Sequence, residues 1–370
     1  MQNKTGKADA KSVWIGGDHP VVVQSMTTTD TADADKTLEQ IYGLAMEGCE
    51  VVRVTVKDPP DAAGLPAIVH RSPVPIVADI HFDHKMALAA IEAGVAKLRL
   101  NPGNIRDVSK TREVVEAAKA RGIPIRIGVN MGSLAPDLEK TLGLTPEAMV
   151  ESALRHVRIL EDLGHTDMVI SLKAHDVRNT VFAYRLMDQR LRERNTPYAL
   201  HLGITEAGLL RDGTIKSSIG LGILLFEGIG DTIRVSLAAD PIEEVPVCWG
   251  ILKSLGLREK GFEITACPSC GRAEISVLEL GRSVEAIAKE YTAPVKVAVM
   301  GCVVNGPGES KMADVGVAGG KGKGAIYRAG ELVGTFPEAQ LLGALRLEIE
   351  KVIVEKYPEY AHELSTPASL

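Results

Sequence analysis

The amino-acid sequence predicts an α/β protein, with an N-terminal (β/α)8 TIM barrel followed by a small C-terminal α+β domain. The first observation is a unit that occurs eight times in about 255 residues. Each unit has a short apolar run, a polar turn and a helical pattern, as a barrel of this kind requires. The second is that the repeat stops after Leu257. The third is the length of 370 residues, which is enough for two domains.

The predicted strands are four to seven residues long and rich in Val, Ile and Leu, as strands buried on both faces should be. They are Val21–Met26, Val51–Val56, Pro75–Ile80, Lys97–Leu100, Ile123–Val129, Asp167–Leu172, Tyr198–Ile204 and Thr232–Leu237. A doubly wound open sheet is the alternative. Such a sheet usually carries a Gly-rich phosphate turn after its first strand, and the segment from Gln24 to Thr27 is not one.

Helical patterns lie between the predicted strands, and several of them end at a glycine. Glycine is the residue that most easily adopts the left-handed conformation found just after a helix. The helices expected on this basis are Thr37–Glu47, His84–Ala93, Arg112–Ala120 and Pro146–Leu163. This alternation of strand and helix favours the barrel.

The C-terminal domain is expected to begin after a polar linker, Arg258–Gly261, which places the two domains at residues 1–257 and 262–370. A helical pattern covers Val277–Tyr291, an apolar run covers Val295–Met300, and a final helix runs from Pro337 to about Lys356. The glycine-rich segment Gly316–Gly324 lacks the spacing of a Walker loop, so a turn-rich β-hairpin is the better interpretation.

Composition excludes several classes of function. The net charge is −6, the pI is near 5.9 and aromatic residues make up only 4%, which argues against a nucleic-acid binder or a protein bound to an anionic membrane. No apolar run is long enough to span a membrane, and the polar N-terminus does not look like a signal peptide. A cytoplasmic protein with reduced thiols is expected.

Polar side chains gather where the predicted barrel strands end, which is the end at which barrel enzymes work. Many lie two residues apart, so both members of a pair share one face of a strand. Four arginines and a lysine come from five strands and predict an anion site, because guanidinium groups bind phosphate oxygens in bidentate fashion. The alternative is that these cations pair with carboxylates of the barrel. The residues are Arg53, Asp79, His81, Arg99, Asn101, Arg126, Asn130, Lys173, Glu206 and Arg234.

The five cysteines fall into two groups. Cys49 and Cys248 lie in apolar surroundings and are interpreted as core residues. For Cys267, Cys270 and Cys302 three interpretations compete: a zinc site, a redox Cys-x-x-Cys pair and an iron–sulfur cluster. No histidine lies between residues 201 and 362 to complete a zinc site, and a redox pair would leave Cys302 unused. The spacing favours an iron–sulfur cluster over zinc but leaves both open. The Gly/Pro-rich loop after Cys302 could return the carboxylate of Glu309 to that thiol.

The sequence closely resembles the bacterial two-domain form of the 4-hydroxy-3-methylbut-2-en-1-yl diphosphate synthase family, from end to end. The motifs that carry the resemblance are Val22-Val23-Gln24-Ser25-Met26-Thr27, Ala78-Asp79-Ile80-His81-Phe82, Leu98-Arg99-Leu100-Asn101-Pro102-Gly103-Asn104, His201-Leu202-Gly203-Ile204-Thr205-Glu206-Ala207-Gly208, Cys267-Pro268-Ser269-Cys270-Gly271-Arg272 and the loop Gly301–Glu309. The last two motifs together are highly specific.

The resemblance implies a reductive dehydration and ring opening of 2-C-methyl-D-erythritol 2,4-cyclodiphosphate to (E)-4-hydroxy-3-methylbut-2-enyl diphosphate. It also implies a 4Fe–4S cluster held by Cys267, Cys270, Cys302 and Glu309, and diphosphate contacts from the strand-end cations. Glu206 and Glu309 are the implied catalytic residues. Flavodoxin or ferredoxin is the implied electron donor, and a head-to-tail homodimer is the implied assembly. One alternative is a barrel protein with a purely structural metal site that only binds a phosphorylated metabolite. The other is a zinc-dependent aldolase or hydrolase.

Overall fold

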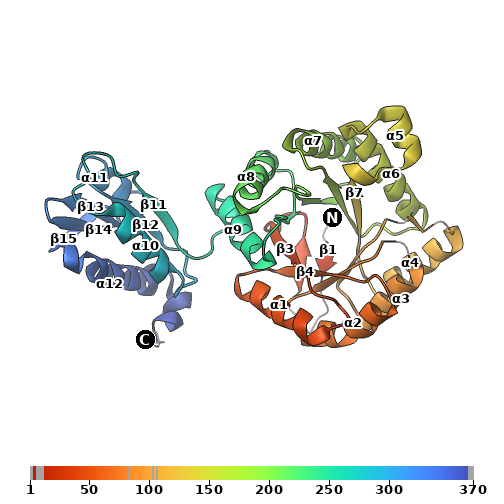
Figure 1. Cartoon of the computed structure of the whole chain (residues 1–370), viewed down its shortest axis with the longest axis horizontal. Helices are drawn as coiled ribbons and strands as arrows, with labels where there is room; N and C mark the ends of the chain where they lie inside the picture. The colour runs from red at the N-terminus through yellow and green to blue at the C-terminus, as the bar shows by residue number, and fades with distance from the viewer. Residues whose placement is uncertain (1–2, 6–11, 82, 102–103, 106, 366–370) are drawn as a thin grey trace. The chain divides into compact units, whose positions relative to one another are not determined.

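The computed structural model describes residues 3–5, 12–81, 83–101, 104–105 and 107–365, and the chain divides into two compact units (Figure 1). The first unit is Met1–Arg258 and the second is Glu259–Leu370. Each unit has a hydrophobic core of its own. No helix among the described residues is long and apolar enough to cross a membrane.

The first unit is a closed barrel of parallel strands, as the sequence predicts. The strands follow the order β10-β3-β4-β5-β6-β7-β8-β9 around the barrel, so that the last pairs with the first. Their bounds are β3 Val22–Met26, β4 Val51–Thr55, β5 Ile76–Asp79, β6 Lys97–Arg99, β7 Ile125–Asn130, β8 Met168–Lys173, β9 Ala199–Leu202 and β10 Thr232–Ile233. Each observed strand overlaps one predicted run, and most are shorter because only part of each run pairs with its neighbours.

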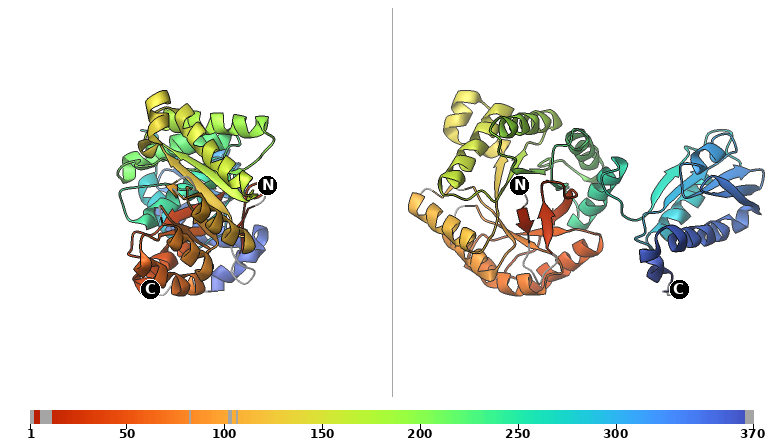
Figure 2. Two further views of the ribbon diagram at one scale, coloured as in Figure 1. Left: turned by 90° about the vertical axis from the view of Figure 1, so that its right-hand side faces the viewer. Right: turned by 180° about the vertical axis from the view of Figure 1, so that it is seen from behind.

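A ring of helices surrounds the barrel strands (Figures 1 and 2). They are α1 Ala34–Met46, α2 Pro59–Arg71, α3 His84–Ala93, α4 Val108–Ala120, α5 Pro136–Leu142, α6 Pro146–Asp162, α7 Val177–Glu193, α8 Leu210–Phe226 and α9 Glu244–Ser254, with short 3₁₀ turns η2 Met131–Ser133 and η3 Pro241–Glu243. An aspartate side chain caps the first turn of α1, α2, α3, α4 and α7, where its negative charge faces unpaired backbone N–H groups. These caps fix where the loops that follow the strands must end.

The N-terminal end of the barrel is closed by apolar side chains. A short hairpin of β1 Asn3–Thr5 and β2 Val13–Ile15 precedes the barrel, and it was not predicted from the sequence. Ile15 packs against the inward-facing side chains at the starts of the strands, which are Val22, Val51, Val77, Val169 and Ala199. We call these six residues the barrel floor. Because the floor is sealed, polar groups in the barrel interior are reached from the C-terminal ends of the strands.

The second unit is a five-stranded sheet with helices packed on it. The strand order is β11-β12-β13-β14-β15, parallel across the first three strands and antiparallel across the last three. The strands are β11 Glu263–Ala266, β12 Lys296–Met300, β13 Val315–Gly320, β14 Lys323–Arg328 and β15 Glu331–Pro337. The helices are α10 Val277–Ala288, α11 Gly306–Ser310 and α12 Glu338–Lys356, followed by a 3₁₀ segment, η4 Pro358–Ser365. The glycine-rich segment forms the β13–β14 hairpin, as predicted.

Candidate active site

The predicted strand-end residues converge on one small cavity at the C-terminal ends of the barrel strands. Its volume is about 140 Å³. Eight of the ten predicted barrel residues line it, together with Gly128, Ser171, Thr205 and Ser236. We call this cavity the anion pocket. The predicted residues in its lining are Arg53, Asp79, His81, Arg99, Arg126, Asn130, Lys173 and Arg234.

Asp79 organises two of the guanidinium groups. Its carboxylate is buried, with Oδ1 3.2 Å from Arg99 Nη1 and Oδ2 3.7 Å from Arg53 Nε. Burial alone would raise the pKa of Asp79, but the positive charges of Arg53 and Arg99 outweigh it and hold that pKa below its usual value. Asp79 therefore remains ionised and fixes the direction of both arginines.

Gly128 leaves the space that Arg99 occupies. A Cβ atom at this position would lie 2.7 Å from Arg99 Nε, closer than a side chain can approach. Arg99 Nη2 instead donates to the Gly128 carbonyl at 3.0 Å, and Asn101 exchanges two hydrogen bonds of 2.8 Å with the backbone of Gly128. The structure thus gives Asn101 the role of holding β7 against β6, and it does not place Asn101 in the pocket lining.

Neither Arg126 nor Lys173 forms an ion pair with any carboxylate among the residues that the structure describes. Arg126 is 1% exposed, and its Nε and Nη1 atoms have no hydrogen-bond partner within the described part of the chain. Burial, with the neighbouring charges of Arg53 and Arg99, lowers the pKa of Arg126 well below its usual value. Burial, with Arg234 and Arg126, does the same to Lys173. Unpaired buried cations destabilise a fold, so this arrangement indicates a site built to be completed by an anion.

Glu244, on α9, is a buried carboxylate beside the pocket that the sequence analysis did not identify. Its buried carboxylate lies 3.5 Å from Arg234 Nη2 and accepts hydrogen bonds from Ser25 Oγ at 2.9 Å and from the Leu237 N–H at 3.0 Å. Nothing in the local pattern of a helix start marks such a residue, because acidic side chains are common there. Counted at formal charges, the five cations Arg53, Arg99, Arg126, Lys173 and Arg234 exceed the two carboxylates, Asp79 in the lining and Glu244 beside it, by three.

Glu206 occupies a strained position beside the pocket. It follows Thr205, which lines the pocket, but Glu206 itself is not in the lining. Its φ angle is 53°, a left-handed conformation that residues other than glycine rarely adopt. Such strain is retained mainly where function requires it. The backbone conformation therefore favours a functional role for Glu206, although Glu206 does not line the cavity.

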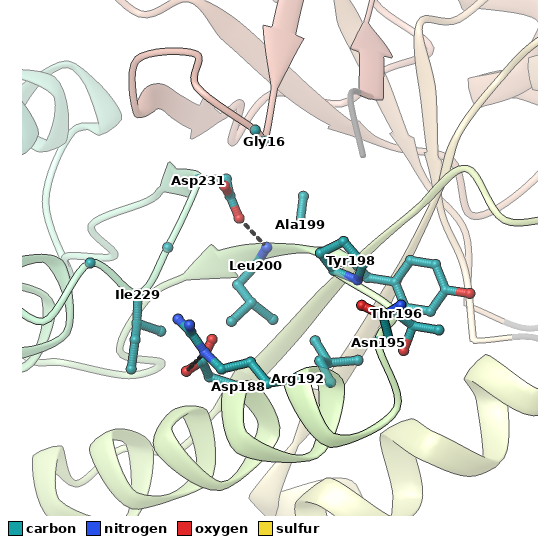
Figure 3. Close-up of a pocket in the computed structure, with 15 residues that line it drawn as sticks. Gly16, Asp188, Arg192, Asn195, Thr196, Tyr198, Ala199, Leu200, Ile229 and Asp231 are labelled. Carbon is teal, nitrogen blue, oxygen red and sulfur yellow. Dashed lines mark hydrogen bonds and ion pairs between the residues drawn. The ribbon is translucent and has the colours of Figure 1, made fainter.

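A second hollow of about 500 Å³ lies at the opposite end of the barrel (Figure 3). It is lined by Gly16, after β2, and by residues at the starts of β9 and β10, including Tyr198 and Asp231. The Asp231 carboxylate accepts a hydrogen bond from the Leu200 N–H at 2.6 Å, which ties the two strand starts together. None of the predicted site residues lines this hollow.

The three predicted ligand cysteines lie on neighbouring parts of the second unit. Cys267 follows β11, Cys302 follows the adjacent strand β12, and Glu309 lies on α11. The Gly301 N–H donates to Cys267 Sγ at 3.2 Å, which links the two cysteine loops. A Cβ at Gly319 would lie 2.3 Å from the Gly301 carbonyl oxygen, so only glycine allows β13 to pass this loop.

The donor set at these loops fits an iron–sulfur cluster. All three cysteines are free thiols and at least partly exposed, and Ser269 between Cys267 and Cys270 has a left-handed φ of 53°. Among the described residues, no group of three or more His, Cys, Asp or Glu side chains is close enough to hold a single metal ion. Soft thiolates supported by backbone N–H donors are the usual environment of a cluster, whose several irons need ligands spread more widely than one ion does.

Cys49 and Cys248 are core residues, as predicted. Their exposed fractions are 2% and 1%, and both pack in the hydrophobic core of the barrel. Burial raises the pKa of each thiol to about 12. Neither can supply a thiolate at neutral pH, so neither competes with the three cysteines of the second unit.

Family models match both units. The model described as the GcpE TIM-barrel domain matches residues 5–249, and the model described as the GcpE protein C-terminal domain matches residues 263–351. The chain belongs to the GcpE family. The two matches follow the same division of the chain that the structure shows.

Curated GcpE-type relatives cover nearly the whole chain. A protein of Geobacter sulfurreducens is 54% identical over 96% of this chain and 100% of its own length. A protein of Lawsonia intracellularis is 52% identical over 96% of this chain and 98% of its own. One of Caldanaerobacter subterraneus subsp. tengcongensis is 53% identical over 92% of this chain and 95% of its own. All three are named 4-hydroxy-3-methylbut-2-en-1-yl diphosphate synthase (flavodoxin).

Proposed function

We infer that this chain carries the activity for which its relatives are named. It is an oxidoreductase of isoprenoid biosynthesis that converts 2-C-methyl-D-erythritol 2,4-cyclodiphosphate to (E)-4-hydroxy-3-methylbut-2-enyl diphosphate. In this reaction a C–O bond of the cyclic diphosphate breaks, two electrons enter, and a hydroxyl group leaves as water after taking up a proton. The observation that carries the inference is the near full-length match to these relatives.

The anion pocket is the proposed binding site for the diphosphate. Its cations would bind the phosphate oxygens and stabilise the negative charge on the oxygen that leaves carbon. Asp79 keeps Arg53 and Arg99 in place before the substrate arrives, and Glu244 does the same for Arg234. Because these guanidinium groups are already oriented, little free energy is lost in ordering them when the ligand binds.

His81 and Asn130, which line the same pocket, are proposed to contact the substrate, and Asn101 to support the strand that carries Asn130. Glu206 is proposed to donate a proton from its carboxyl group to the departing hydroxyl. Glu206 directly follows Thr205, which lines the cavity, so its place in the chain supports this role.

Members of this family are iron–sulfur enzymes, and a 4Fe–4S cluster is the proposed form of the cofactor. Cys267, Cys270 and Cys302 would hold it by their thiolates, and Glu309, on α11, by its carboxylate. When bound, the cluster supplies single electrons and a Lewis-acidic iron. The soft donor set of three thiolates supports iron–sulfur chemistry over a hard divalent ion.

Flavodoxin is the proposed electron donor, because the relatives carry that word in their names. Ferredoxin, the other one-electron carrier predicted, is the alternative. We also propose the cytoplasm as the location and a head-to-tail homodimer as the assembly. Only eight residues separate the end of α9 at Ser254 from the start of β11 at Glu263, so the linker is short. Sedimentation of the holoprotein tests the assembly, and a monomer at all concentrations would contradict it.

The deciding experiment is anaerobic purification followed by iron and sulfide analysis and a turnover assay with the cyclic diphosphate and reduced flavodoxin. We expect about four irons per chain and product formation. Cys302→Ser should lose most of the iron, whereas Cys248→Ser, a matched change in the core, should keep it. Glu309→Ala should retain some iron yet lose most turnover. Stoichiometric zinc, or binding of the diphosphate without product, would contradict the proposed function.

A further inference from the structure

Lys97 lies at the base of the anion pocket and has a different environment from the cations that line it. It begins β6, two residues before Arg99, so both side chains point into the barrel interior. Its backbone is in register with Val77, a residue of the barrel floor. The side chain is 0% exposed. The ammonium group is therefore enclosed between the floor and the pocket.

The ammonium group of Lys97 forms no ion pair within the part of the chain that the structure describes. Lys97 Nζ has no hydrogen-bond partner among the residues that the structure describes. The positive charges of Arg126 on β7 and Arg53 on β4 disfavour a further positive charge there. The imidazole of His201 on β9 is buried nearby, and this burial, with the charge of Lys97 in turn, lowers its pKa. Asp167, just before β8, is the one carboxylate among the groups that act on Lys97, and its Oδ1 atom is itself without a partner.

Burial disfavours the charged form of an ammonium group that forms no ion pair, because its hydration is lost. Burial first, and the charge of Arg126 second, lower the pKa of Lys97 to about 7. In the free protein the side chain is thus close to the point at which it loses its proton at physiological pH. Any negative charge placed near Arg126 and Arg53 will shift this balance toward the ammonium form.

We propose that Lys97 takes up a proton from solvent when the diphosphate binds in the anion pocket. The resulting ammonium group, at the base of the pocket, then attracts the diphosphate together with the cations of the lining. Lys97 then acts as a positioning residue that couples substrate affinity to pH. This inference depends on the proposed function, because it requires a doubly charged anion in the pocket. The substrate itself does not titrate in this range, since each phosphorus of a cyclic diphosphate lacks the second ionisation, near pH 6, of a phosphate monoester.

Isothermal titration of the cyclic diphosphate into the oxidised holoenzyme, without reductant so that no turnover occurs, tests the proposal. Titrations at pH 8 in buffers of different protonation enthalpy give the number of protons taken up. We expect about half to one proton per site, and an affinity that falls up to about tenfold for each pH unit above 7.5. In Lys97→Arg, whose guanidinium remains protonated, binding should persist without proton uptake.

Lys97→Met should bind about tenfold more weakly at pH 7, with no proton uptake and little dependence on pH. Lys85→Met, the same change on the exposed surface of α3, should match the wild type. Wild-type binding without proton uptake, or uptake that persists in Lys97→Met, would overturn this inference and leave the proposed function unaffected. So would uptake lost in His81→Asn but kept in Lys97→Arg, because the proton would then go to the pocket histidine. If the wild type did not bind the cyclic diphosphate, the proposed function would be contradicted as well.

Discussion

Replacing Arg126 by methionine separates stability from function in this barrel. Arg126 is 1% exposed, and two of its guanidinium nitrogens have no partner within the described residues. Each unsatisfied buried donor costs roughly 1–3 kcal/mol. Methionine fills a similar volume and carries no charge. We therefore expect Arg126→Met to raise the free energy of unfolding by about 2 kcal/mol, within the range found when other buried charged groups were replaced by apolar ones.

The same substitution should damage catalysis. Arg126 lines the anion pocket, and a bidentate contact with phosphate comprises two hydrogen bonds to a charged group. Such bonds contribute roughly 1.5–3 kcal/mol each. Their loss corresponds to a decrease in kcat/KM of about 10²-fold to 10⁴-fold. Stability and activity are thus expected to change in opposite directions, as they do where a site is built at the expense of the fold.

Calorimetry and the turnover assay measure the two effects. A gain of 2 kcal/mol corresponds to a rise in Tm of about 4–8 °C for a domain of this size. The control is Arg158→Met, an exposed position on α6, where both quantities should change little. A fall in Tm for Arg126→Met would refute the reasoning, because it would mean that internal water or another group already satisfies the guanidinium in the free protein.

Three further substitutions test the organisation of the pocket. Asp79→Asn should weaken substrate binding at least tenfold at pH 7. Because the pKa of Asp79 is lower in the folded protein than in the unfolded chain, its carboxylate stabilises the fold fully above the unfolded pKa near 4, and this stabilisation is lost as the pH falls through the folded pKa. The difference in free energy of unfolding between wild type and variant, measured in urea, should therefore be smaller at pH 3 than at pH 7. Glu244→Gln should lower the free energy of unfolding by about 1–3 kcal/mol. Calorimetry should also show weaker binding of the cyclic diphosphate, because Arg234 loses the carboxylate that orients it; unchanged binding would contradict this role of Glu244. Gly128→Val should raise KM at least tenfold with a native far-UV spectrum, because its side chain would displace Arg99; an unchanged KM would contradict the assigned position of that arginine.

The barrel was predictable because its signals are local and repeated. A run of β-branched residues, a polar turn and a helical pattern recur along the first unit, and Gly48, Gly94, Gly122 and Gly164 at helix ends all have the positive φ that the pattern requires. The β1–β2 hairpin gives no such signal, since Asn3–Thr5 is short and polar. β1 and β2 have only three residues each, too few for an alternating apolar pattern to mark them as strands.

In the pocket, local spacing predicted some features, whereas others depend on contacts between residues far apart in the sequence. Spacing by two along each strand identified the residues that face the barrel interior, and the closed parallel barrel then brings their ends together. Spacing did not distinguish a residue that faces the cavity from one that braces its wall, as Asn101 does by its hydrogen bonds to Gly128. The carboxylate of Glu244 comes from a helix near the end of the barrel, and only the closure of the barrel places it beside Arg234.

The two carboxylates explain how an acidic chain keeps an anion site. If every cation of the pocket were paired, a diphosphate would have to break an ion pair for each contact it made. If none were paired, mutual repulsion would spread the guanidinium groups apart. Asp79 holds Arg53 and Arg99 in place, and Glu244 holds Arg234. At formal charges an excess of three positive charges is left, which an anion of charge −2 largely neutralises. Orientation is thus established in the free protein, whereas charge balance is completed only by the ligand.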